Sequence, residues 1–188
     1  AFAIEDHYKP RFAGDELPRN AVGVVVALAD KLETLVGMFG IGNLPSGDKD
    51  PFALRRHALG VIRMLVERDL PLDLGHLAGI AVRALGPLVA DVPKTLGLVS
   101  DFLFDRLAVS LREQGYSAQE VDAVLARRDR RATEVPKALA AVRAFAALPE
   151  SASLAAANKR VANILAKSAP GGAQAPEPAR FVDAQERE

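Results

Sequence analysis

Hydrophobic residues recur along this chain at intervals of three and four positions and rarely alternate with polar ones. This spacing matches the period of the α-helix, in which residues i, i+3, i+4 and i+7 share one face. The pattern therefore predicts an all-α fold, a bundle of several helices. We expect helices near residues 1–7, 20–38, 51–69, 73–90, 94–114, 117–127, 134–147 and 151–168.

Residues that start and stop helices stand near the ends of these segments. Asp50 can act as an N-cap by accepting from free backbone N–H groups, and Pro51 suits the first helical position, which needs no N–H. Gly115 suits a helix C-terminus, and Ser117 suits the N-cap of the next helix. Residues 169–179 are rich in proline and glycine, with too little apolar surface to offset the entropy lost on ordering, so we expect a mobile loop there.

Two runs of the sequence carry cationic side chains at helical positions where folding would accept almost any polar residue. The first run, residues 49–56, ends in two arginines. On a helix, Arg56 lies opposite the apolar arc, whereas Arg55 projects from within it. Because burying an unpaired guanidinium is costly, Arg55 must find a carboxylate or a phosphate. We expect Arg55 to form a structural ion pair with Asp30, and Arg56 to be the better binding candidate.

The second run, residues 155–165, predicts an amphipathic helix. On the helix expected over residues 151–168, Leu154, Val161 and Leu165 share one side, which we expect to face the core. The other side is basic and able to form hydrogen bonds, and its residues are Lys159, Arg160, Asn163 and Lys167.

A cluster of arginines stands at the end of the helix expected over residues 117–127. Arg127, Arg128, Arg130 and Arg131 flank Asp129. Cations at a helix C-terminus interact favourably with the negative end of the helix macrodipole, which accounts for one or two of them. Four arginines are more than the macrodipole accounts for, and such a surplus of cations is typical of a loop that contacts phosphates.

The composition narrows the possible functions. With 24 basic and 24 acidic residues the formal net charge is zero, so any affinity for nucleic acid must come from local basic faces. The absence of cysteine excludes disulfides, thiolate zinc sites and cysteine nucleophiles. No uninterrupted apolar stretch approaches the roughly 18 residues of a membrane span, so we expect no membrane partner.

Familiar catalytic motifs do not match. Residues 42–49 have the glycine spacing of a phosphate loop, but Asp48 stands where its lysine would be, and that charge repels phosphate. The three histidines, His7, His57 and His76, lack metal-ligand spacing. We therefore expect neither a catalytic residue nor a metal site in this chain.

Seven runs spread over most of the chain form a specific combination, although any one of them alone would be weak. They are Tyr8–Asp15, Ala27–Leu35, Phe39–Gly42, Lys49–Arg56, Gly115–Tyr116, Ala123–Arg128 and Ala155–Leu165. Read together, they resemble the beta subunit of the bacterial two-subunit glycyl-tRNA synthetase. Because that family's beta chain is several times longer, we expect this chain to be a piece of a larger polypeptide.

The resemblance implies two regions, the end of an HD-like helical region at 1–92 and an incomplete DALR-type anticodon-binding helical domain at 93–188, similar to that of arginyl-tRNA synthetase. It implies a part of glycine-tRNA ligase that binds tRNA(Gly) in the cytoplasm, with an alpha subunit in an alpha2beta2 heterotetramer. The alpha subunit would hold glycine and ATP with Mg, so this piece would bind no cofactor and would be inactive alone. The residues expected to bind tRNA are Arg56, Arg127, Arg128, Arg130, Arg131, Lys159, Arg160, Asn163 and Lys167.

Two other interpretations remain open. Asp30 follows Ala29 as in the metal site of HD phosphohydrolases, which makes a metal-dependent phosphohydrolase fragment the enzymatic alternative. Gly23 and Gly37 lie seven residues on either side of Asp30, so a neighbouring helix can approach and meet its carboxylate. The non-enzymatic alternative is a helical scaffold that only joins subunits.

Overall fold

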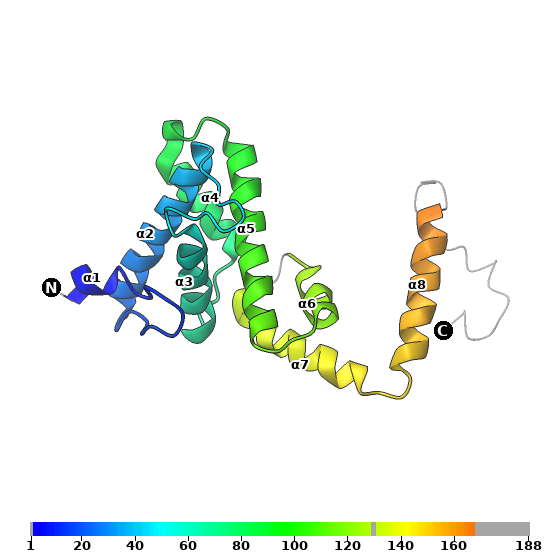
Figure 1. The fold of residues 1–188 in the computed structure, drawn as a ribbon. Coiled ribbons are helices and arrows are strands. Elements are labelled where there is room, and N and C mark those ends of the chain that lie inside the picture. The colour runs from blue at the N-terminus through cyan, green and yellow to red at the C-terminus, as the bar shows by residue number, and fades with distance from the viewer. Residues whose placement is uncertain (1, 129–130, 168–188) are drawn as a thin grey trace, which may run out of the picture. The chain divides into compact units, whose positions relative to one another are not determined.

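A computed structural model describes residues 2–128 and 131–167. These residues form eight α-helices and two short 3-10 helices with no strand among them, which confirms the all-α prediction (Figure 1). The α-helices are α1 (Phe2–Asp6), α2 (Ala21–Gly40), α3 (Leu54–Glu67), α4 (Leu74–Leu85), α5 (Val92–Glu113), α6 (Ala118–Leu125), α7 (Val135–Ala146) and α8 (Ser151–Lys167). The 3-10 helices are η1 (Gly86–Leu88) and η2 (Ala132–Glu134).

The chain divides into two units, residues 1–144 and residues 145–188. In the first unit, α2, α3, α4 and α5 pack against one another and share one apolar core. Helix α1 packs on α2, and α6 packs on α5. The boundary expected near residue 92 falls inside this first unit, at the start of α5.

The apolar face predicted for α3 is buried as expected. Its buried residues include Leu54, Ala58, Val61, Ile62 and Leu65, none more than 3% exposed. Burying a leucine or valine fully contributes about 1.5–3 kcal/mol, so this face binds α3 to α2 and α5 far more strongly than helix propensity would.

The start of α3 differs from the prediction. The carboxylate of Asp50 does accept from two free backbone N–H groups, those of Leu54 at 2.8 Å and Arg55 at 3.0 Å. The helix begins at Leu54, however, because Ala53 adopts a left-handed conformation with φ of 54°. Pro51 therefore precedes the helix and does not occupy its first position.

Two further helix ends show how local residues fix the boundaries. The helix expected to reach residue 90 ends at Leu85, because Gly86 has a φ of +50° and starts a 3-10 turn. Ser117 is the N-cap of α6 as predicted, and Glu120 completes a capping box with it. Gly115, with φ of +88°, separates α5 from that cap, in keeping with its predicted role.

Charged contacts fix the segment between α1 and α2. Asp6 has no exposed surface and accepts from both the backbone and the guanidinium of Arg19 at 3.0 Å. These hydrogen bonds lower the pKa of Asp6 to about 2, although burial alone would raise it. At Gly23, a Cβ would lie 3.0 Å from the Cβ of Asp6, so this glycine permits the close approach of a carboxylate-bearing helix. Gly37, in contrast, has open space around it.

In the second unit, α8 contains no buried residue. The expectation that Leu154, Val161 and Leu165 face a core is wrong for the described structure, since they are 53%, 53% and 67% exposed. The reason is that the described residues of this unit comprise only α8 and the segment leading to it, too few to enclose an apolar face. The loop expected at 169–179 lies outside the described residues.

No single helix in the described ranges is long and apolar enough to cross a membrane. The helical stretches Ala132–Ala146 and Ser151–Lys167 would meet that requirement only if they were counted together.

Candidate nucleic-acid interface

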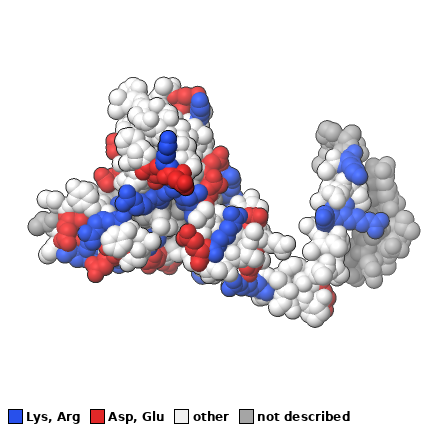
Figure 2. Space-filling model, in the orientation of Figure 1, with Lys and Arg blue, Asp and Glu red and all other residues white. Residues whose placement is uncertain are grey.

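Helix α8 presents one uninterrupted basic face. Lys159, Arg160, Asn163 and Lys167 are all exposed, and Figure 2 shows the cationic side chains of this helix in blue. The helix carries no aspartate or glutamate, and within the described residues none of the three cations forms an ion pair. Their charge is therefore available to an external anion, with an amide donor and acceptor between them.

The arginines that follow α6 are less available to an external anion than the cations of α8. Arg128 forms an ion pair with Asp101 of α5, and its guanidinium carbon lies 5.4 Å from the centre of the Phe104 ring. Arg127 and Arg131 are exposed, and Arg130 lies outside the described residues. Because Arg128 is already paired, an incoming phosphate would have to displace a carboxylate there.

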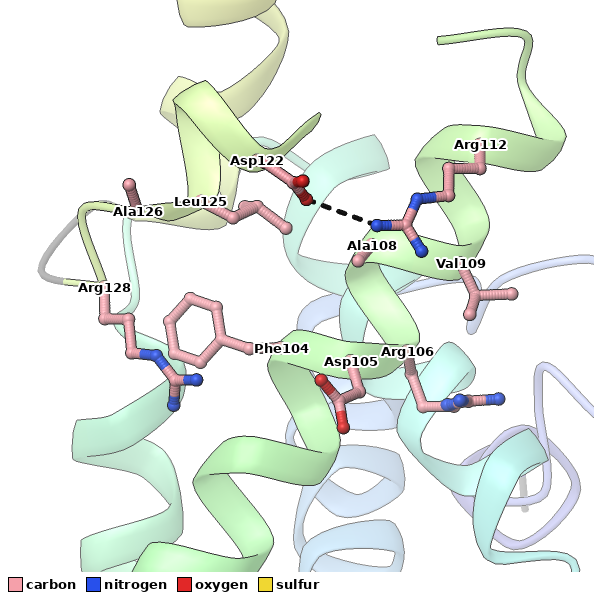
Figure 3. A pocket seen from close by; sticks show the side chains of 10 residues that line it. All are labelled: Phe104, Asp105, Arg106, Ala108, Val109, Arg112, Asp122, Leu125, Ala126 and Arg128. Atoms are coloured by element: carbon pink, nitrogen blue, oxygen red, sulfur yellow. Dashed lines mark hydrogen bonds and ion pairs between the residues drawn. The ribbon is translucent and has the colours of Figure 1, made fainter. Parts of the chain in front are cut away.

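Arg128 also lines a cavity of about 450 Å³ beside α5 and α6 (Figure 3). Two other arginines line it: Arg112, which pairs with Asp122 at 3.2 Å, and Arg106, whose Nε is buried without a partner. Two of the three arginines are thus neutralised by carboxylates, so the cavity offers little net positive charge. This cavity could not be predicted from the sequence, because its lining is spread from Phe104 to Arg128 and contains no recognisable motif.

The ion pair expected between Asp30 and Arg55 is not formed. Arg55 donates through Nη2 to the carbonyl oxygen of Gly47 at 2.5 Å, and no ion pair in the described part of the chain joins it to Asp30. The prediction failed because Arg55 is half-buried at the helix edge and reaches the turn before α3. The described residues also contain no cluster of three or more His, Asp or Glu side chains able to hold a metal ion.

Arg56 is exposed on α3 and lies at a small cavity bounded by α2, α3 and the segment after α1. Within the described residues, it forms no hydrogen bond or ion pair. The structure thus places the predicted tRNA-binding residues in three groups: one on α8, one after α6, and Arg56 alone on α3.

Comparison with known proteins identifies the chain's relatives. A family model described as glycyl-tRNA synthetase beta subunit matches residues 1–126. The glycine–tRNA ligase beta subunit of Polaromonas naphthalenivorans is 73% identical over 169 residues, covering 90% of this chain and 23% of that protein. The protein of the same name from Thiobacillus denitrificans is 62% identical over 192 residues, covering 100% of this chain and 26% of that protein.

The chain thus spans about a quarter of the length of the curated relatives that it matches. The family model covers two thirds of the chain, and it includes the helices of the first unit up to α6. The chain belongs to the glycyl-tRNA synthetase beta subunit family.

Proposed function

We propose that this chain contributes tRNA(Gly) binding to ATP-dependent synthesis of glycyl-tRNA, as part of a beta subunit. In this proposal, an alpha subunit holds glycine and ATP with Mg, and the two subunits form an alpha2beta2 heterotetramer in the cytoplasm. Residues 1–92 form the end of an HD-like region, and residues 93–188 begin an anticodon-binding helical domain. Support comes from the family to which the chain belongs.

The observation that carries the proposal is the basic face of α8. Lys159, Arg160 and Lys167 are exposed cations without ion pairs among the described residues, and Asn163 lies between them. Most of the affinity of a protein for RNA comes from contacts between such side chains and phosphates. The sequence of the chain has equal numbers of acidic and basic residues, so a face free of carboxylates is informative.

The exposed apolar side of α8 fits the same proposal. Leu154, Val161 and Leu165 would be covered by helices of the remaining three quarters of the beta polypeptide. The basic face would then be the only side of α8 left for RNA. The arginines after α6 form a second, weaker group, because Arg128 is paired with Asp101.

The test is to change Lys159, Arg160 and Lys167 together to glutamate in the complete beta polypeptide with its alpha subunit. Each lost phosphate contact should reduce the dependence of log affinity on log salt by roughly 0.7–0.9. Binding should weaken to a similar degree for tRNAs with different anticodons, because phosphate contacts carry no sequence information. Affinity is measured by filter binding at several salt concentrations.

A matched control changes three exposed cations of the first unit, Arg83, Lys94 and Lys137, to glutamate. This variant has the same change in net charge but no altered residue on α8. If both variants lose affinity equally, the effect reflects overall charge and the α8 face is not the binding site. If the α8 variant binds tRNA with unchanged affinity and salt dependence, the helix is a scaffold and the arginines after α6 become the main candidates.

A further inference from the structure

A cavity of about 210 Å³ lies where α2, α3 and the segment after α1 meet. Two runs that are far apart in the sequence, Tyr8–Asp15 and Lys49–Arg56, both contribute to its lining. Four of the lining side chains are basic, and none of the described residues that line the cavity is acidic. The basic side chains are Arg11, Lys31, Arg56 and His57.

Two of these groups are held in place by other residues. Arg11 is bonded twice to Asp15, at 2.9 Å from Nε and 3.1 Å from Nη2. Lys31 is 2% exposed, and its amine donates to the carbonyl oxygens of His7 and Tyr8, each at 3.3 Å. An ammonium has three N–H donors, so Lys31 retains one that these two bonds do not use.

The other two groups are Arg56, which has unused donors, and His57, which has a ring nitrogen without a partner. Arg56 forms no hydrogen bond or ion pair with any described residue, which leaves its five N–H donors unused. The Nδ1 atom of His57 is buried without a hydrogen-bond partner. Because this atom is buried, His57 lines the cavity through the rest of its ring.

The electrostatics of the cavity favour an anion. Burial lowers the pKa of Lys31, and Asp30 and Asp15 offset this only in part. Burial also lowers the pKa of His57; the charges of Lys31 and Arg56 lower it further, whereas Asp30 and Asp50 raise it. An anion in the cavity would attract the charges of Lys31 and Arg56 and would offset the repulsion that they exert on a protonated His57.

The size of the cavity limits what can enter. Pockets for whole small molecules usually measure about 300–1,000 Å³, and this one is smaller. It suits one compact anionic group. A phosphate has several strong acceptor oxygens, and the planar fork of an arginine binds two of them at once.

We propose that this cavity binds a phosphate group, held by the guanidinium of Arg56 and the free N–H of Lys31, with the ring of His57 as part of the lining. The phosphate belongs either to an RNA backbone or to a free phosphate or nucleotide. This site is separate from the basic face of α8 and does not depend on the function proposed for that helix.

The first experiment adds inorganic phosphate to this chain and follows the amide resonances of residues 53–57 by NMR, with sodium chloride at equal ionic strength as the reference. We expect saturable shifts. Arg56→Ala should weaken binding by at least roughly tenfold, because it removes a charge-assisted hydrogen bond. Arg83→Ala, which removes an exposed arginine of α4 away from the cavity, should leave binding unchanged.

A second set of measurements identifies the source of the phosphate in the Lys159, Arg160 and Lys167 glutamate variant, so that α8 cannot contribute. One ligand is a nucleoside 5′-monophosphate, and the other is a short single-stranded RNA without terminal phosphates. Competition by the RNA for the inorganic phosphate site indicates a backbone phosphodiester; competition by the mononucleotide alone indicates a terminal or free phosphate. The proposal is overturned if none of the three ligands gives saturable shifts, or if Arg56→Ala leaves them unchanged.

Discussion

At the scale of single residues, charge pairs in buried positions fix the beginning of the chain. Asp6 receives hydrogen bonds from the backbone N–H and from Nε of Arg19 and also lies 3.6 Å from the amine of Lys9. Lys9 in turn reaches the exposed Glu16 at 3.3 Å. The carboxylate of Asp6 has no exposed surface, so these partners must replace the contacts with water that it loses on folding.

This dependence leads to a prediction about pH. The folded-state pKa of Asp6, about 2, lies below its ordinary value of 3.8, so the ionised group stabilises the fold above about pH 4, and this contribution is lost as the pH falls towards 2. Asp6→Asn should lower the melting temperature at pH 7. The difference from the parent chain should shrink between pH 4 and pH 2, as measured by circular dichroism.

Glu16→Gln is the control for Asp6→Asn, because it removes a carboxylate whose side chain is 83% exposed. Exposed pairs contribute little to stability, so its effect at pH 7 should be smaller. A melting-temperature difference for Asp6→Asn that stays constant from pH 7 to pH 2 would show that the charge of Asp6 does not stabilise the fold.

At the scale of the helices, the sequence predicted the regular elements well and their ends less well. Periodicity located the eight α-helices of the described residues, because each buries or presents an apolar stripe that repeats every three to four residues. The start of α3 was missed, because capping by Asp50 is compatible with a helix that begins directly after it or one turn later. Only the left-handed conformation of Ala53 decides between the two, and alanine gives no sequence signal for it.

The candidate site was less predictable than the helices. The basic face of α8 could be read from the sequence, because all of its members lie on one helix. The cavity beside Arg56 could not, because His57 and Lys31 come from different helices that tertiary packing brings together. The partner of Arg55 was also mispredicted, because a backbone carbonyl such as that of Gly47 exists at every position and leaves no trace in the sequence.

The conformation of Ala53 gives a prediction at this scale. A left-handed conformation costs an alanine roughly 1–2 kcal/mol, which glycine avoids, whereas glycine adds about 0.4–1 kcal/mol of unfolded-state entropy. Ala53→Gly should therefore increase the free energy of unfolding by about 0.5–1 kcal/mol in urea titrations. The same substitution at Ala123, inside α6 and exposed, should decrease it by about 0.5–1 kcal/mol. Destabilisation by both substitutions would contradict the assigned conformation of Ala53.

At the scale of the whole molecule, the described chain offers surfaces for binding and no recognisable machinery for chemistry. The region with a phosphate-loop-like glycine spacing, residues 42–49, forms a turn with an isolated bridge between Ser46 and Lys49. It ends beside the capping carboxylate of Asp50, whose oxygens already occupy the free N–H groups at the start of α3. The backbone N–H groups of Leu54 and Arg55 are therefore not available to a phosphate as those of a phosphate loop would be.

We therefore predict that the purified chain alone does not form glycyl-adenylate. The measurement is glycine-dependent exchange of pyrophosphate into ATP, with a complete glycyl-tRNA synthetase assayed in parallel as the positive control. The exchange should remain at the background level seen without glycine. Exchange above that background, abolished by removing glycine, would place an adenylation site within these 188 residues.

The crossing of α2 and α3 restricts how the sequence of this family can change. A Cβ at Gly60 would lie 2.8 Å from Cε and 3.0 Å from Cδ of the buried Lys31. A larger residue at position 60 is compatible only with a shorter or redirected side chain at position 31, whose amine anchors the carbonyls of His7 and Tyr8. We therefore expect the two positions to be coupled, so that any residue larger than glycine at position 60 requires the side chain at position 31 to move or to be replaced.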